Sequence, residues 1–399
     1  MMKILYVAHN IRDASKGAAY ADISLLDELR RRGHLVEERW DIGSPRRIRH
    51  DNLHLLLEAP GRCRRTVADA LHEAEFDVVL VNQPLGYRVA ELMRRRPNGG
   101  LYVARTHGWE PFVAAERRRW GEWSEGRSRP RRIASRLLEP GLLRQNRLVL
   151  EGAHGIVLAS EDDRRGLVDS GAFPGERTVV IEPGLPVEFR EGAPAAMTPE
   201  RARRVLHVGQ FVRIKAPAIT AVAIARILES NSSAEATWVC EAVDHEAVRS
   251  LFPCGVRGRL RLLPWLSRRE LVEVYDRHGI FVFPSYYEGF GQTFLEAMAR
   301  GLVVLASEVG GMKQTIRSGE DGYLFAPGDA SGIAVRALEL QRDPARLSAI
   351  GRKASAVAAT RTWEHSAAKL ESFLLRLIAM ETDRLTRRVE ANVTKAGGR

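Results

Sequence analysis

The chain has 399 residues, more than a single hydrophobic core usually organises, so the sequence predicts two domains. Hydrophobic residues make up 45% and charged residues 28%, which excludes a disordered or fibrous protein. The formal net charge of +11 leaves nucleic acid, anionic membrane surfaces and phosphorylated ligands open as partners.

The cysteines and the apolar segments indicate a cellular compartment. Cys63, Cys240 and Cys254 lack the C-x-x-C spacing of a zinc site and the pattern of a disulfide framework. The first apolar run ends at His9 and Asn10 and predicts a strand, not a signal peptide. No apolar stretch approaches the roughly 20 residues that span a bilayer. We therefore expect a cytoplasmic location, with any membrane contact peripheral and on the inner face.

Short aliphatic runs alternate with helical patterns along the chain. They are KILYVAH, DVVLVN, GLYVART and HGIVLAS in the first half, then RVLHVGQ, GIFVFPS and LVVLAS. Continuous apolar runs of this length are typical of strands buried on both faces. Strands that alternate with helices predict parallel sheets, so we expect two Rossmann-like, doubly wound α/β domains facing a central cleft.

The alternation begins afresh near Arg204, after a segment rich in Pro, Ala and charge. Because ligands of such folds bind at the carboxyl ends of the strands, the site is expected there. The tail is polar and ends in Gly-Gly-Arg, so we expect it to be frayed. The expected organisation is a first, acceptor-binding domain at 1–186, a linker at 187–202, a second, donor-binding domain at 203–360, a C-terminal helix at 361–382 and a polar tail at 383–399.

The segment from Arg117 to Arg147 interleaves arginines with Trp120 and Trp123. One interpretation is a solvated helical face whose tryptophans dock on the core. The other is an interfacial segment, in which arginines meet lipid phosphate and tryptophans lie at the headgroup level. The second interpretation would suit a lipid-borne acceptor.

The most informative stretch is PSYYEGFGQTFLEAMARG, residues 284–301, which follows a predicted strand. Gly289 and Gly291 allow a tight turn and a close approach of a ligand to the backbone, and a good helix begins at Gln292. The free N–H groups and the positive dipole end of such a helix bind phosphate. The loop therefore predicts a phosphate site at a strand-to-helix junction.

Two carboxylates flank this junction, Glu288 before the turn and Glu296 inside the helix, with seven residues between them. Ionised carboxylates accept hydrogen bonds from hydroxyls, so a sugar and a ribose on either side of a diphosphate are sensible partners. Here the sequence resembles the retaining glycosyltransferases of family four, which have the GT-B fold and an E-x7-E motif. The resemblance implies that Glu288 lies by the donor sugar and that Glu296 binds the ribose. It covers about residues 2–380 and is strongest after 204.

The segment HVGQFVRIKAP, residues 207–217, is similar to the family element whose Arg and Lys bind the donor diphosphate. Lys215 matches the lysine, whereas Gln210 stands where the arginine usually does. Since a cation stabilises the departing diphosphate, we expect the loss of one to slow catalysis unless Arg213 or another arginine substitutes.

Three further loops carry the resemblance. THGWEP resembles the acceptor-domain H-G element, which makes His107 the candidate for a sugar contact. The first loop resembles the glycine loop where donor phosphate and acceptor meet, with Gly17-Ala18 in place of Gly-Gly. LLPWLSRREL occupies the place of the base-binding loop. There, Trp265 either stacks on the nucleobase or is itself a residue of the core.

Two C-terminal features complete the resemblance. ASEVGGMKQTIRSGEDGYLFAPGD is similar to the family's G-G…E signature, with Gln314 in place of the Glu, and Trp363 resembles the tryptophan that starts a final helix across the first domain. The catalytic candidates are His107, Lys215 and Glu288. The candidates for donor binding are Gly17, Gln210, Arg213, Lys215, Trp265, Leu266, Glu288, Gly289, Phe290, Gly291, Gln292, Thr293 and Glu296.

These assignments predict transfer of a sugar from a nucleotide sugar, UDP- or GDP-linked, to a hydroxyl of a glycan, a lipid-linked saccharide or a small molecule, as in polysaccharide biosynthesis. No D-x-D motif or spaced ligand cluster is present, so we expect metal-independent transfer without a further cofactor. The resemblance implies retention of the anomeric configuration, by a front-face displacement in which the leaving phosphate helps to deprotonate the acceptor.

Other functions stay open on the sequence. A sugar-nucleotide epimerase or a glycoside phosphorylase could use the same architecture. The departures at Gln210, Ala18 and Gln314 allow a noncatalytic homologue of the transferases. A nucleic-acid-binding module is disfavoured because its motifs are lacking and the arginines are spread along the chain.

Overall fold

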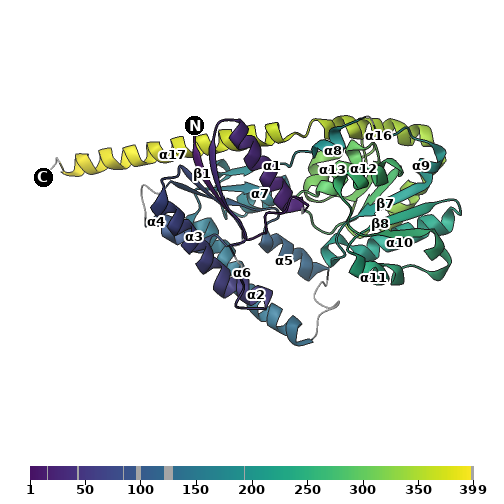
Figure 1. Cartoon of the computed structure of the whole chain (residues 1–399), viewed down its shortest axis with the longest axis horizontal. Coiled ribbons are helices and arrows are strands. Elements are labelled where there is room, and N and C mark those ends of the chain that lie inside the picture. The colour runs from purple at the N-terminus through teal and green to yellow at the C-terminus, as the bar shows by residue number, and fades with distance from the viewer. Residues whose placement is uncertain are drawn as a thin grey trace.

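The computed structural model describes residues 1–15, 17–42, 45–83, 85–95, 100–120, 129–192 and 194–396. Two α/β lobes lie side by side along the long axis of the molecule (Figure 1). The strands of the first lobe precede those of the second in the chain, and each lobe has its own sheet. The predicted fold class, two Rossmann-like α/β domains, is confirmed.

The first sheet consists of β1 (Lys3–Val7), β2 (Leu35–Arg39), β3 (Val78–Asn82), β4 (Leu101–Arg105), β5 (Gly155–Leu158) and β6 (Thr178–Val180). Its strands are parallel and follow the order β2-β1-β3-β4-β5-β6. The chain turns outward from β1 to β2 and then returns to place β3 on the other side of β1. The direction of winding therefore reverses between β1 and β3, the place where such sheets open a crevice.

The second sheet consists of β7 (Arg204–Val208), β8 (Glu235–Val239), β9 (Leu260–Leu263), β10 (Ile280–Phe283), β11 (Val303–Ser307) and β12 (Tyr323–Phe325). Its strands are also parallel, in the order β12-β11-β10-β7-β8-β9. Winding reverses between β7 and β10, so the loops after these two strands emerge next to each other.

Helices connect the strands and cover the sheets. Those of the first lobe are α1 (Gly17–Arg31), α2 (Asp51–Leu53), the π-helical turn His54–Glu58, α3 (Ala59–Glu73), α4 (Tyr87–Arg94), α5 (Glu110–Arg119), α6 (Arg129–Gly152) and α7 (Glu161–Asp169). Between the sheets, in the region expected to be a linker, lie α8 (Val187–Arg190) and α9 (Pro199–Arg203). Those of the second lobe are α10 (Pro217–Ser230), α11 (His245–Ser250), α12 (Arg268–Asp276), α13 (Gln292–Ala299), α14 (Gly310–Thr315), α15 (Ala330–Arg342) and α16 (Pro344–Ala359).

Both faces of each sheet are buried, which explains the continuous apolar runs of the strands. Successive side chains of a strand point to opposite faces. Leu5 and Val7 of β1 therefore pack with α3 and α4, whereas Ile4 and Tyr6 of the same strand pack with α1. The second sheet likewise has a separate hydrophobic cluster on each face.

The C-terminal helix α17 (Trp363–Ala396) runs back along the first lobe (Figure 1). Its residues Leu370, Phe373 and Leu374 join the cluster of β1 and α1. We expected the helix to end at 382, but it continues to Ala396, because no Gly or Pro interrupts the chain before Gly397. Neither α17 nor any other described helix is apolar enough over a sufficient length to cross a membrane.

Candidate active site between the two lobes

Two predicted catalytic candidates meet where the second sheet reverses its winding. Lys215 ends a 3-10 turn (Arg213–Lys215) after β7, and Glu288 lies in the loop after β10. Nζ of Lys215 lies 2.5 Å from Oε1 of Glu288, and the hydroxyl of Ser285 donates to the same oxygen at 2.8 Å. An ammonium has three N–H donors, so Lys215 can hold Glu288 and still donate to a phosphate.

The turn between Glu288 and α13 is shaped by two glycines. Gly291 adopts φ 90°, a left-handed conformation that favours glycine, and precedes α13 without a capping side chain. Gly289 touches the first lobe so closely that a Cβ atom there would lie 1.7 Å from the carbonyl oxygen of His107. The N-terminus of α13 is therefore held against the H-G loop with its first N–H groups free of a side-chain cap, which is suitable for an anion.

Glu296 lies one turn into α13 and is 8% exposed. The hydroxyl of Tyr275 donates a hydrogen bond to its Oε2 at 3.1 Å. Burial raises the pKa of Glu296 to about 7, against the smaller opposing effects of Tyr275 and of the charge of Arg268. Hydroxyl donors from a ligand would stabilise the ionised carboxylate, so this side chain is suited to bind a diol.

His107 follows β4 and faces the second lobe. Its Nε2 lies 2.9 Å from Oδ2 of Asp22, which is fully buried on α1 and also pairs with Arg105 at 2.6 Å. Burial opposes the ionisation of Asp22, yet the charges of His107 and Arg105 outweigh it and hold its pKa well below the usual range. Because an ionised carboxylate only accepts, Nε2 of His107 must carry the hydrogen. The other ring nitrogen, Nδ1, has no partner among the described residues and can meet a ligand.

Asp22 was missed by the sequence analysis, although a signal exists. It lies on the apolar stripe of α1 at positions i, i+3, i+4 and i+7 with Leu25, Leu26 and Leu29, all of which are buried. An acidic residue on a buried helix face needs partners to be stable, so its position indicates a polar network beneath the glycine loop.

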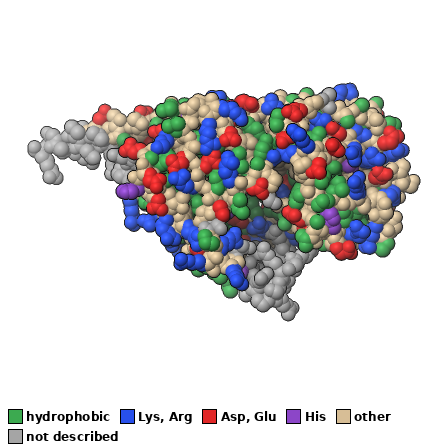
Figure 2. All heavy atoms as spheres, viewed as in Figure 1, with side chains coloured by type: hydrophobic (Ala, Val, Ile, Leu, Met, Phe, Trp, Pro, Cys, Tyr) green, Lys and Arg blue, Asp and Glu red, His purple; other side chains and the backbone are tan. Residues whose placement is uncertain are grey.

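The two lobes meet around this site through further polar contacts. The carbonyl of Gly17 accepts a hydrogen bond from Nε2 of Gln292 at 3.1 Å. The guanidinium of Arg268 lies 3.6 Å from the ring centroid of Tyr20 and donates to the carbonyl of Ala14 at 2.5 Å. The glycine loop of the first lobe is thus fixed above the start of α13, and Figure 2 shows a hollow between the lobes.

Gln314, which replaces the family's Glu, also joins the lobes. Its Oε1 accepts from the backbone N–H of Glu161 at 2.8 Å, and its Nε2 donates to Oε1 of Glu182 at 2.8 Å. A glutamate could not donate to Glu182, because an ionised carboxylate has no hydrogen to offer. The amide of Gln314 therefore suits its acidic partner Glu182 better than a glutamate would.

The remaining donor-binding candidates differ in their exposure and in their partners. Phe290 is 5% exposed and packs on Phe294 in the core, so it offers the site only its backbone. Nε of Arg213 donates to the carbonyl of Trp120 at 2.9 Å. Gln210 is exposed after β7, the carbonyl of Thr293 accepts from Tyr275, and Trp265 and Leu266 are half-buried against the core.

The described part of the Arg117–Arg147 segment does not present Trp120 to a membrane. The ring of this tryptophan stacks on Tyr286 of the second lobe, with centroids 4.2 Å apart, and its indole nitrogen donates to Glu116. Trp123 lies outside the described residues. For Trp120, the interpretation of a docked aromatic residue replaces the interfacial one, because the facing lobe supplies the apolar surface.

No group of three or more His, Cys, Asp and Glu side chains in the described part of the chain is arranged to hold a metal ion. Lys215 and Glu288 lie together before the start of α13, the loop of His107 faces them from the first lobe, and Glu296 lies one turn into α13. They combine a cation, a helix N-terminus and hydroxyl acceptors, which is the set that a sugar diphosphate requires.

Comparison with known proteins points in the same direction. Residues 202–343 match the family described as glycosyl transferases group 1. A D-inositol 3-phosphate glycosyltransferase from Thermobispora bispora is 29% identical over 238 residues, 56% of this chain and 56% of that protein. The chain thus matches about half the length of this curated relative.

Solved structures share the fold of the whole chain. Sucrose-phosphate synthase from Thermosynechococcus elongatus has a TM-score of 0.74 and 19% identity, covering 95% of this chain and 100% of that one. Anabaena HepE, solved in complex with UDP and glucose, has a TM-score of 0.66 and 17% identity, covering 94% of this chain and 99% of that one. Residues 202–343, which carry the E-x7-E loop, thus resemble the glycosyl transferases group 1, and the whole chain has the GT-B fold of these solved structures.

Proposed function

We propose that this protein is a retaining glycosyltransferase that transfers a sugar from a nucleotide sugar to an acceptor hydroxyl. The observation that supports it most is the 2.5 Å pairing of Lys215 with Glu288 at the start of α13, opposite His107. A cation and a helix N-terminus beside a carboxylate suit a diphosphate bonded to a sugar.

In the proposed ground state, the diphosphate lies at the N-terminus of α13 and within reach of Lys215. Glu288 accepts hydrogen bonds from sugar hydroxyls, and Nδ1 of His107 meets the sugar from the first lobe. Glu296 accepts hydrogen bonds from the ribose hydroxyls. The donor is thus bound mainly by the second lobe, and the first lobe shapes the acceptor side.

In the proposed reaction, the bond between the anomeric carbon and the phosphate oxygen breaks, and a bond from the same face to the acceptor oxygen forms. The proton of the acceptor hydroxyl passes to the leaving phosphate oxygen. Lys215 and the α13 amides stabilise the charge that develops on the diphosphate, without a metal ion. The product therefore keeps the anomeric configuration of the donor.

UDP-linked hexoses are the first donors to examine, because HepE, which has the same fold, was solved with UDP and glucose. The acceptor is a hydroxyl of a glycan, a lipid-linked saccharide or a small molecule. Peripheral contact of the basic segment Arg117–Arg147 with an anionic membrane stays a prediction, and its arginines Arg117 and Arg118 are partly neutralised by Glu110 and Glu139 at 3.0 Å.

The test is calorimetric titration of UDP, GDP and ADP into the wild-type protein and two variants. We expect one nucleotide to bind with micromolar affinity and to lose at least tenfold in Glu296→Ala. Glu246→Ala, which removes an exposed acid of α11, is the matched control and should bind as the wild type does.

The configuration of the product is then read by NMR with the donor that carries the preferred base. Retention of configuration in the presence of a chelator supports the proposal. An inverted product would overturn the retaining mechanism, and failure to bind any nucleotide would favour a noncatalytic homologue.

A further inference from the structure

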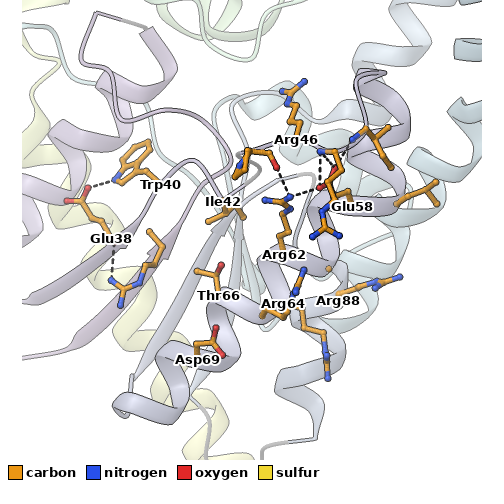
Figure 3. A pocket seen from close by; sticks show the side chains of 17 residues that line it. Glu38, Trp40, Ile42, Arg46, Glu58, Arg62, Arg64, Thr66, Asp69 and Arg88 are labelled. Carbon is orange, nitrogen blue, oxygen red and sulfur yellow. Dashed lines mark hydrogen bonds and ion pairs between the residues drawn. The ribbon is translucent and has the colours of Figure 1, made fainter.

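A pocket outside the donor site opens in the first lobe, at the carboxyl end of β2 (Figure 3). It lies between the loop after β2 and the helix α3, and has a volume of about 1260 Å³. Seven of its lining residues are arginines and three are acidic. Figure 2 shows Lys and Arg side chains gathered on this side of the first lobe. We call it the arginine pocket; its lining includes Arg46, Arg47, Arg62, Arg64 and Arg65.

The acidic residues of the arginine pocket leave much of this charge uncompensated. Glu58 is occupied by Arg62 at 2.6 Å and by Nδ1 of His54 at 2.9 Å. Glu38 pairs with Arg12 at 3.0 Å and with Arg30, both outside the lining. Glu38 and Glu58 are therefore already engaged, and Asp69 is the one remaining acid of the lining for the other arginines.

Three of these arginines face solvent without a protein partner. Among the described residues, no hydrogen bond or ion pair engages the guanidinium groups of Arg47, Arg64 and Arg65, and all three side chains are exposed. Arg64 and Arg65 lie on α3, a regular helix, so their positions are fixed by the backbone. Like charges gathered without counter-charges repel one another, and an anion that bridges them would relieve the repulsion.

The arginine pocket lies on the same edge of the sheet as the candidate active site. The N–H of Ala8 donates to the carbonyl of Arg39, and that of Asp41 to the carbonyl of Asn10, both at 2.9 Å. These bonds tie the loop after β2 to the loop after β1, which leads to the glycine loop.

His9 lies in the loop after β1, which is bonded to the end of β2. Burial lowers the pKa of His9 to about 4, and the nearby charges of His107 and Arg46 act in the same direction. Arg46 lines the arginine pocket, whereas His107 faces the donor site. The loop after β1 therefore connects the walls of the arginine pocket with the glycine loop beside the donor site.

The chemistry of the lining selects the ligand. A guanidinium presents a planar fork of N–H donors that matches phosphate oxygens, and several such groups suit more than one negative charge. Trp40 and Ile42 are also among the lining residues and add apolar surface, against which a sugar ring or an alkyl chain can lie. The volume is above the range of an ordinary small-molecule site, which is roughly 300 to 1,000 Å³.

We propose that the arginine pocket binds the phosphate groups of a phosphorylated acceptor and directs the rest of that acceptor to the donor sugar. The inference rests on the proposed glycosyl transfer. It assigns the acceptor class, a phosphate or diphosphate ester of a saccharide. Such an acceptor is either free in solution or attached to a lipid.

The first experiment measures binding of inorganic pyrophosphate by calorimetry at several salt concentrations. Saturation with UDP beforehand blocks the donor site, so that only other anion sites remain. We expect binding that weakens with salt and weakens at least tenfold in the double variant Arg64→Ala/Arg65→Ala. The control is Arg226→Ala/Arg249→Ala on the second lobe, which removes the same charge and should bind pyrophosphate as the wild type does.

The second experiment compares acceptors with the wild type and the double variant. Glucose 6-phosphate, glucose and a polyprenyl diphosphate saccharide in phosphatidylcholine vesicles are the probes. We expect at least a tenfold higher KM for a phosphorylated probe in the double variant, and an unchanged KM for glucose. Use of the soluble ester identifies a free phosphate, and use of the vesicle probe alone identifies a lipid-linked one.

Equal pyrophosphate binding by wild type and double variant would overturn the inference, as would an equal KM for every probe. Failure of the proposed function looks different, because the wild type would then bind no nucleotide at the donor site. UDP binding without pyrophosphate binding would therefore reject the acceptor pocket alone.

Discussion

The hydroxyl of Tyr287 lies 2.8 Å from Oδ2 of Asp163 and joins the two lobes one residue before Glu288. The same hydroxyl accepts a hydrogen bond from the backbone N–H of Trp109 at 2.9 Å. Tyr287 comes from the second lobe, whereas Asp163 and Trp109 come from the first. The hydroxyl of Tyr287 therefore fixes the loop that carries Glu288 to the first lobe, and its partner Trp109 lies two residues after His107.

Tyr287→Phe should weaken this connection. A hydrogen bond to a charged group contributes about 1.5 to 3 kcal/mol, so we expect kcat/KM to fall by roughly tenfold or more while the second lobe keeps its nucleotide affinity. Tyr323→Phe is the control, because its hydroxyl accepts a hydrogen bond from Arg346 of the same lobe and has no partner among the described residues of the first lobe. Steady-state kinetics of both variants test the role, and equal kcat/KM values in the two variants would contradict it.

Glu296 predicts a pH dependence of nucleotide binding. In the free protein its pKa is raised by burial to about 7, from an ordinary value of 4.5. Because the ribose hydroxyls need the ionised form, UDP affinity should rise up to tenfold per pH unit as pH increases toward 7 and level off above it. Calorimetry from pH 5.5 to 8.5 measures this, and Glu296→Gln should bind more weakly with a flat profile.

The raised pKa of Glu296 also makes the stability of the free protein depend on pH, in the direction opposite to the UDP affinity. A carboxyl whose pKa is raised in the folded state contributes stability below pH 4.5 that is lost as pH rises through about 7. Free protein should thus lose stability over the range in which it gains UDP affinity. An apo stability profile that stays level through this range in the wild type, relative to Glu296→Gln, would show that the pKa of Glu296 is not raised in the folded state.

Much of the fold could be predicted from sequence because its interior strands are apolar on both faces. The runs that became β1, β3, β4, β5, β7, β10 and β11 are of this kind. Strands β2, β6 and β12 were not predicted because they lie at sheet edges, where charged residues or three-residue lengths remove the pattern. Interior β8 was also missed, since Glu235 and Thr237 interrupt its apolar run.

The candidate site divides in the same way. Lys215, Glu288 and Glu296 belong to short motifs after strands, and local sequence is enough to find them. Asp22 and Asp163 act through residues distant in the chain, since Asp22 meets His107 and Asp163 meets Tyr287 only once the helices and lobes are packed. Contacts between residues so far apart in the chain produce no recognisable motif spacing in the sequence.

His107 and Asp22 give a prediction that separates catalysis from stability. His107→Ala should lower kcat about 10²-fold, by removing one preorganised polar contact to the sugar, with little change in melting temperature. The melting temperature should change little because the side chain of His107 is 29% exposed, and because Asp22 keeps its ion pair with Arg105 in the variant. Kinetics and thermal melts measure both effects, with the exposed His365→Ala of α17 as control. A melting temperature that falls as far as kcat would indicate a structural role.

The packing of α17 on the first lobe can be measured with two neighbouring leucines. Leu374 is 0% exposed in the cluster of β1 and α1, whereas Leu375 is 49% exposed. Leu374→Ala should cost about 2 to 5 kcal/mol, because it removes buried methyl groups and leaves a cavity, and Leu375→Ala should cost less than about 0.5 kcal/mol.

UDP affinity should stay unchanged in both leucine variants, since α17 packs on the lobe opposite the donor site. Urea denaturation measures the difference in the free energy of unfolding. Calorimetry without urea, at a temperature well below the melting point, measures the UDP affinity. If Leu374→Ala were as stable as Leu375→Ala, the helix would not be packed on the sheet. A tenfold loss of UDP affinity in Leu374→Ala alone would instead mean that α17 positions the two lobes for donor binding.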